Sequence, residues 1–142
     1  MMNANLELQP VIRLANLWNA STREVYGGTK HPLTPKQLGQ LKMLRSRLGY
    51  WARFVIDWTI SNWAPFAKAA KSAAGLASAP PLPHIGFLLC HYHIAVGLMT
   101  SAAKAMPGDG FFKTEVLRME DDFRKKREQE FQAWRLTEDI TT

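Results

Sequence analysis

The residues of this chain that could hold a metal ion are few, and their spacing does not bring them together. His84, His91 and His93 form the only candidate ligand cluster in the sequence. On a helix, residues two positions apart point to different sides, so His91 and His93 cannot converge on one ion, and His84 shares a face with His91 alone. A zinc site requires three or four converging ligands. We therefore expect a structural role for these side chains, with no metal and no bound cofactor.

The carboxylates and the glycine pairs do not predict an active site either. Asp121 and Asp122 each have a lysine four positions later, a spacing typical of surface ion pairs on a helix. Such pairs do not resemble a general acid and base. The glycine pairs at 27–28 and 108–110 lack the spacing of a phosphate-binding loop. We predict a protein without enzymatic activity.

Cys90 is the single cysteine, so the chain cannot form an internal disulfide. It lies in a long apolar segment, where free cysteines usually behave as small hydrophobic residues. We expect a buried and unreactive thiol.

Charge is the strongest functional signal in the sequence. The net charge is +6, yet residues 1–75 alone carry ten Lys and Arg against three Asp and Glu, and residues 30–55 contain no acid. Solvated helix faces normally mix both signs, so a face of one sign favours an anionic partner, most commonly nucleic acid. A merely solvated face is the alternative. The candidate binding residues are Lys36, Lys42, Arg45, Arg47, Arg53, Lys68 and Lys71.

Four of these residues, Lys36 to Arg47, lie in a segment that has the clearest helix signals in the chain. Thr34 has the position of an N-cap, Pro35 follows at the first helical position, and Gln37 completes a capping box. Gly49 follows Leu48 and provides a stop. The sequence predicts a helix over residues 35–48.

Apolar residues at helical spacing predict four further helices. Trp51, Trp58 and Trp63 fall on this spacing, which favours packing in a core over a stacking surface for bases. A loop with Gly27 and Gly28 as its breaker is expected at 21–32. The predicted helices cover residues 6–20, 50–63, 66–74 and 111–136.

A long segment at 85–106 follows a proline-rich stretch and contains no charged residue before Lys104. Its length of about 20 residues would reach across a bilayer. However, His91, Tyr92 and His93 lie in its middle, where polar groups are costly in a membrane. We therefore predict a buried central helix and no membrane contact. The expected fold is an all-α single domain of five to six helices around this segment, covering 1–136, with a flexible tail at 137–142.

The predicted helix at 111–136 is amphipathic and heavily charged. Its apolar stripe consists of Phe112, Val116, Met119, Phe123, Phe131 and Trp134. Such a stripe favours packing across the core, and pairing with a second copy of the chain, as a homodimer, is the alternative.

Three stretches together resemble helical modules of phage and plasmid replication proteins. They read LTPKQLGQLK at 33–42, VIDW with NWAPF between 55 and 66, and PPLPHIGFLL at 80–89. The tryptophan-rich helix, short spacer and proline pattern are also similar to phage helicase loaders, and the likeness covers about residues 33–97. The chain departs from these families in having no winged-helix domain and no ATPase loop.

This resemblance implies a replication accessory or adaptor that contacts DNA, the replicative helicase, or both. The alternative is a small phage-encoded interaction module, or an inhibitor of a host complex, whose basic face docks on an acidic protein. The N-terminal residues lack a basic stretch followed by an apolar run, so we expect a cytoplasmic location.

Overall fold

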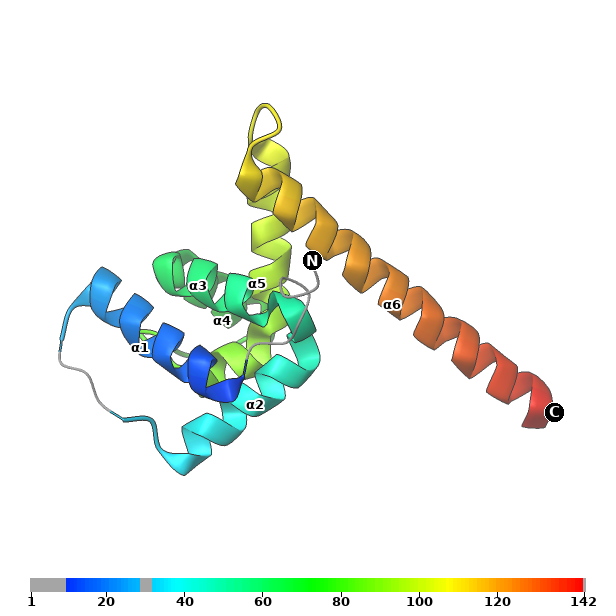
Figure 1. Ribbon diagram of the computed structural model, residues 1–142, viewed down its shortest axis with the longest axis horizontal. Helices are drawn as coiled ribbons and strands as arrows, with labels where there is room; N and C mark the ends of the chain where they lie inside the picture. The colour runs from blue at the N-terminus through cyan, green and yellow to red at the C-terminus, as the bar shows by residue number, and fades with distance from the viewer. Residues whose placement is uncertain (1–9, 29–31, 142) are drawn as a thin grey trace. The chain divides into compact units, whose positions relative to one another are not determined.

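The computed structural model describes residues 10–28 and 32–141, with side chains described up to residue 138. Within these residues the regular structure is helical throughout and contains no strand, which confirms the all-α prediction (Figure 1). The chain divides into two compact units, residues 1–98 and 99–142. The helices are α1 (Val11–Tyr26), α2 (Pro35–Leu48), the short 3₁₀ helix η2 (Gly49–Trp51), α3 (Ala52–Ser61), α4 (Trp63–Ala74), α5 (Ile85–Ala105) and α6 (Phe111–Thr141).

Helix α1 continues six residues beyond the end that the sequence predicts, so the loop expected from residue 21 begins only after Tyr26. Two contacts with α3 explain the extension. The buried Ser21 hydroxyl donates a hydrogen bond to Asp57 Oδ1 (3.0 Å), and the Tyr26 hydroxyl donates one to the Ile60 carbonyl (3.0 Å). These long-range bonds hold residues 21–26 in a helix, although their own sequence gives no such signal. The predicted start at residue 6 lies outside the described residues.

Helix α2 confirms the predicted capping box and both ends. Thr34 Oγ1 accepts a hydrogen bond from the Gln37 backbone N–H (3.1 Å), and Gln37 Oε1 accepts one from the Thr34 backbone N–H (2.9 Å). The helix ends at Gly49, whose φ of 60° is a value that residues with a Cβ rarely adopt. The predicted inner residues Leu41, Leu44 and Leu48 are buried.

Replacing Thr34 with alanine should lower the free energy of unfolding by about 1 kcal/mol, because an orphan N–H of the first turn loses its acceptor. Urea unfolding followed by circular dichroism measures the change. Thr34→Ser keeps the hydroxyl and should retain nearly all of the stability. An alanine variant as stable as the parent would show that the capping box contributes nothing.

The single helix predicted at 50–63 is three elements in the structure. After η2 and α3 the chain is interrupted at Asn62 (φ −122°, ψ 37°), whose side-chain amide donates a hydrogen bond to the Trp58 carbonyl (2.8 Å). Asparagine competes with the backbone in this way, which explains the break. Helix α4 therefore begins at Trp63, and Pro65 lies within its first turn, where a missing N–H is tolerated.

An aromatic cluster joins α4 to the first part of α5. Trp63 and Phe66 are fully buried, with ring centroids 5.1 Å apart, and the Phe87 ring lies 6.0 Å from the first and 5.8 Å from the second. The Trp63 indole N–H donates a hydrogen bond to the Pro80 carbonyl (2.8 Å), which ties the proline-rich stretch to this cluster. Trp51 is also buried. Trp51 and Trp63 therefore belong to the core, as predicted, whereas Trp58 is only half-buried.

The prediction that α5 is buried on every side is wrong. Within the first unit Ile85, Leu88 and Ala95 are buried, whereas Leu89, Ile94 and Leu98 are only half-buried. In the most apolar 18-residue window of the helix, 22% of the residues are buried. The sequence shows that α5 is apolar on all sides, but it does not show how many neighbours cover it.

Among the described residues α5 is the one helix long and apolar enough to span a membrane, judged by length and composition only. One such helix is weak evidence for a membrane protein, because core helices of soluble proteins have similar composition. Its helical geometry is interrupted at His91 (φ −127°, ψ 21°). The absence of membrane contact stays a prediction based on the polar residues in the middle of the helix.

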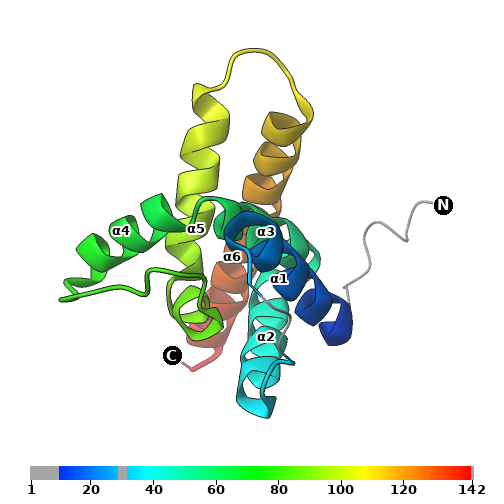
Figure 2. The ribbon, with the colours of Figure 1, turned by 90° about the vertical axis from the view of Figure 1, so that its left-hand side faces the viewer.

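The second unit consists of the end of α5 and all of α6. The end of α5 and the first part of α6 lie side by side (Figure 2), with an ion pair between Lys104 Nζ and Glu120 Oε2 (3.3 Å). Met99 and Ala103 of α5 are buried, as are Val116 and Met119 of α6. Helix α6 continues to Thr141, five residues beyond the predicted end, because no glycine or proline follows residue 136.

Candidate nucleic-acid interface

The two units carry different charges. The first unit has ten Lys and Arg against three Asp and Glu, a formal charge of +7, and the second unit has a formal charge of −1. The basic excess found in the sequence therefore belongs to one folded unit. Its candidate residues are distributed over α2, α3 and α4, which are separate helices of that unit (Figure 2).

The four candidates on α2 do not form one face. At about 100° per residue, Lys36 and Arg47 lie about 20° apart around the helix axis, and Lys42 lies about 120° from Lys36. Both flanks of the buried leucine stripe thus carry basic side chains. Lys36, Lys42 and Arg47 are exposed, whereas Arg45 is half-buried. The predicted basic face of α2 is in fact two basic flanks.

The remaining predicted residues lie on the two following helices. Arg53 is exposed near the start of α3. Lys68 and Lys71 are exposed on α4, three positions apart, so they lie on the same side of that helix. Both avoid the buried side of α4, which contains Trp63 and Phe66.

Arg13 belongs with these residues, although its position in the sequence does not single it out. It lines a surface hollow of about 370 Å³ together with Arg53, so two guanidinium groups from distant parts of the sequence lie around one concavity. Leu14, Asn16, Leu17 and Ala20 complete the lining. In the sequence, Arg13 is a lone arginine on the polar side of the first helix. The packing of α1 against α3 places it and Arg53 around the same hollow.

Acidic residues of the first unit do little to neutralise this charge. Among the described residues, no carboxylate forms an ion pair with Lys36, Lys42, Arg47, Arg53, Lys68 or Lys71. The Asp57 carboxylate instead accepts the hydrogen bond from Ser21. Within the described part of the unit, Glu24 is the only other acid. The basic side chains are therefore available to an external anion.

The histidine and cysteine positions have different surroundings from those expected. His84 Nδ1 accepts a hydrogen bond from the Phe87 backbone N–H (3.0 Å) and so satisfies one donor at the start of α5. His91 lies against the Phe87 ring, with centroids 4.6 Å apart. Cys90 is exposed, so the prediction of a buried thiol is wrong. In the described part of the chain, no group of three or more His, Cys, Asp or Glu side chains is placed so that it could hold a metal ion.

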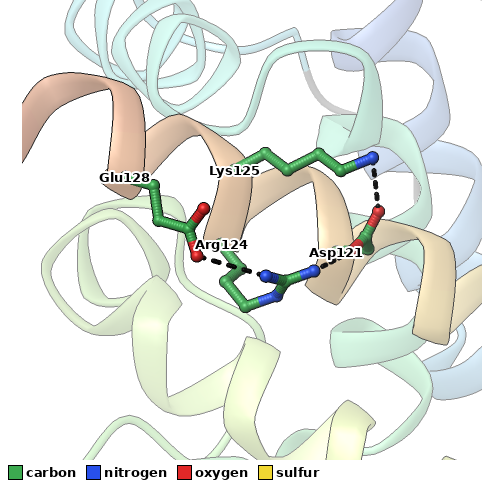
Figure 3. Close-up of polar contacts among 4 residues, drawn as sticks. All are labelled: Asp121, Arg124, Lys125 and Glu128. Atoms are coloured by element: carbon green, nitrogen blue, oxygen red, sulfur yellow. Dashed lines mark hydrogen bonds and ion pairs between the residues drawn. The ribbon is translucent and has the colours of Figure 1, made fainter. Parts of the chain in front are cut away.

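The carboxylates of α6 take part in surface ion pairs (Figure 3). Asp121 accepts hydrogen bonds from Lys125 (3.0 Å) and from Arg124, and Arg124 also contacts Glu128 (3.1 Å). Lys125 and then Arg124 lower the pKa of Asp121 below its usual value. The predicted Asp121–Lys125 pair is confirmed, and Glu120 forms an ion pair with Lys104.

Comparisons with models of protein families, with curated proteins and with solved structures found no match for this chain.

Proposed function

We propose that this chain is a non-enzymatic nucleic-acid-binding protein whose first unit makes the contact. The observation that supports this most is the formal charge of +7 on residues 1–98, with exposed Lys and Arg side chains that the described carboxylates leave unpaired. Phosphate groups are the anions that such a spread of separate positive charges fits, because each Lys or Arg can contact a different phosphate along a backbone. Lysines and arginines on three helices would then follow a nucleic-acid strand and not a single small ligand.

The resemblance of residues 33–97 to replication modules supports a more specific role, that of a phage- or plasmid-type replication accessory. In that role the chain would contact DNA, the replicative helicase, or both, in the cytoplasm. The alternative is a small interaction module or inhibitor that docks on an acidic protein. The separation of the basic residues of α2 into two flanks favours this alternative over the insertion of one helix face into a groove.

Charge reversal tests the proposed interface. The pair Lys36→Glu with Arg47→Glu on α2, and the pair Lys68→Glu with Lys71→Glu on α4, should each weaken binding of a fluorescent DNA duplex at least roughly tenfold, because phosphate contacts are lost and repulsion is added. All four positions are exposed, so thermal unfolding should change little. Fluorescence anisotropy measures the affinity of each variant.

The matched control is Lys126→Glu with Arg135→Glu, which changes the net charge by the same amount on exposed positions of α6. Binding by the control should stay close to that of the parent. If the control loses as much affinity as the α2 and α4 pairs, binding follows total charge and the interface is not on the first unit. If the parent binds no nucleic acid at low salt, the proposal is wrong.

A further inference from the structure

Within the described residues of the second unit, no other element covers the last part of α6. All side chains from Arg124 to Glu138 are exposed, over a length of about 22 Å at 1.5 Å per residue. Helices of this length are marginal in water unless an amphipathic face packs against something. Here two large apolar side chains, Phe131 and Trp134, are 54% and 56% exposed, with ring centroids 5.8 Å apart.

These two rings belong to a narrow strip with a definite charge pattern. At about 100° per residue, Arg127, Phe131, Trp134 and Glu138 fall within about 60° of one another around the helix axis. Their order along the strip is base, ring, ring, acid. Trp134 lies five turns after the buried Val116, so the strip continues the side of α6 that is buried earlier in the helix.

We propose that this strip pairs with the same strip of a second copy of the chain, in an antiparallel arrangement. In the register that places Phe131 opposite Trp134 of the second copy, Arg127 lies opposite Glu138 of the second copy. Because the arrangement is two-fold symmetric, each contact occurs twice. The result is four stacked aromatic rings with an ion pair at each end.

The charge pattern disfavours the parallel alternative. A parallel pair in register would place Arg127 opposite Arg127 and Glu138 opposite Glu138, and like charges across a helix interface are unfavourable. The strip is complementary to itself only when one helix is reversed. The opposite side of α6 offers no such match, since its exposed apolar residue there is Leu136, roughly 170° from the centre of the strip.

The interface is small, so the dimer should be weak. Large aromatic side chains bury about 150–250 Å² each, and these four are already partly covered, which places the contact below the area of a standard stable complex. A monomer–dimer equilibrium that depends on micromolar protein concentration is therefore expected. The dimer is independent of the proposed nucleic-acid contact, because it uses only the second unit and forms without nucleic acid.

Sedimentation equilibrium of the full chain, without nucleic acid and over a series of concentrations, tests the inference. The mass should rise from 16.1 kDa toward roughly twice that value. Phe131→Ser with Trp134→Ser should remove the dimer, whereas the matched control Leu136→Ser, on the opposite side, should leave it unchanged. Circular dichroism of each variant checks that the helical content is retained.

Charge exchange tests the register. Arg127→Glu alone or Glu138→Arg alone should each weaken the dimer, because both ends of the antiparallel pair then carry like charges. The double variant Arg127→Glu with Glu138→Arg restores opposite charges and should recover the dimer. A parent that stays monomeric at all concentrations up to the millimolar range would overturn the inference. Single variants that dimerise as the parent does would overturn the antiparallel register.

Discussion

Replacing Trp63 with alanine should lower the free energy of unfolding by about 3–5 kcal/mol, because the largest fully buried side chain of the first unit is removed. The loss includes ring contacts with Phe66 and Phe87 and the indole hydrogen bond to the Pro80 carbonyl (2.8 Å). A domain of this size has only about 5–15 kcal/mol in total, so the variant should be largely unfolded at 37 °C or close to it. Urea unfolding followed by circular dichroism measures the change.

Trp63→Phe separates packing from hydrogen bonding. The variant keeps an aromatic ring against Phe66 and Phe87 but loses the N–H donor, so it should be clearly more stable than the alanine variant and less stable than the parent. An alanine variant that unfolds at the same urea concentration as the parent would show that this aromatic cluster does not hold α4, α5 and the proline-rich stretch together.

Local signals in the sequence predicted the parts of the fold that depend on local contacts. The ends of α2 follow from Thr34, Gln37 and Gly49, whose hydrogen bonds and backbone angles involve only near neighbours. The end of α4 likewise follows from Gly75, which adopts the left-handed conformation (φ 65°, ψ 35°). Capping chemistry can be predicted from one sequence because the partners are three or four residues apart.

Features that depend on distant partners could not be predicted. The extension of α1 to Tyr26 rests on hydrogen bonds from Ser21 and Tyr26 to residues more than thirty positions away. The exposure of Cys90 depends on which helices cover α5, and composition does not reveal this. Apolar periodicity shows which sides of a helix carry no charge. A side chain is buried only if another element also packs against that side, and the periodicity does not show this.

The residues of the candidate interface could be predicted only in part, because one of them depends on contacts between helices that are distant in the sequence. The excess of Lys and Arg over Asp and Glu in residues 1–75 predicted the basic residues of α2, α3 and α4, and the exposure of all but Arg45 agrees with a surface role. Arg13 could not be selected, because only the packing of α1 against α3 places it and Arg53 around one hollow.

Binding of DNA should depend steeply on salt if the first unit contacts phosphates. Each neutralised phosphate contributes about −0.9 to the slope of log affinity against log salt on a duplex. With about four to six contacts from the exposed Lys and Arg side chains, the affinity should fall roughly 10²–10³-fold between 50 and 200 mM salt. Circular dichroism at both salt concentrations is the control. An unchanged spectrum shows that the protein stays folded, so unfolding does not cause the loss of affinity.

The measurement that tests nucleic-acid binding most directly is this salt titration, made by fluorescence anisotropy with the parent and with the Lys36→Glu, Arg47→Glu variant side by side. The proposed interface predicts a steep linear slope for the parent and a slope shallower by about two units for the variant, one unit for each lost phosphate contact. Equal slopes for the two proteins, or no binding by the parent at 50 mM salt, would contradict it.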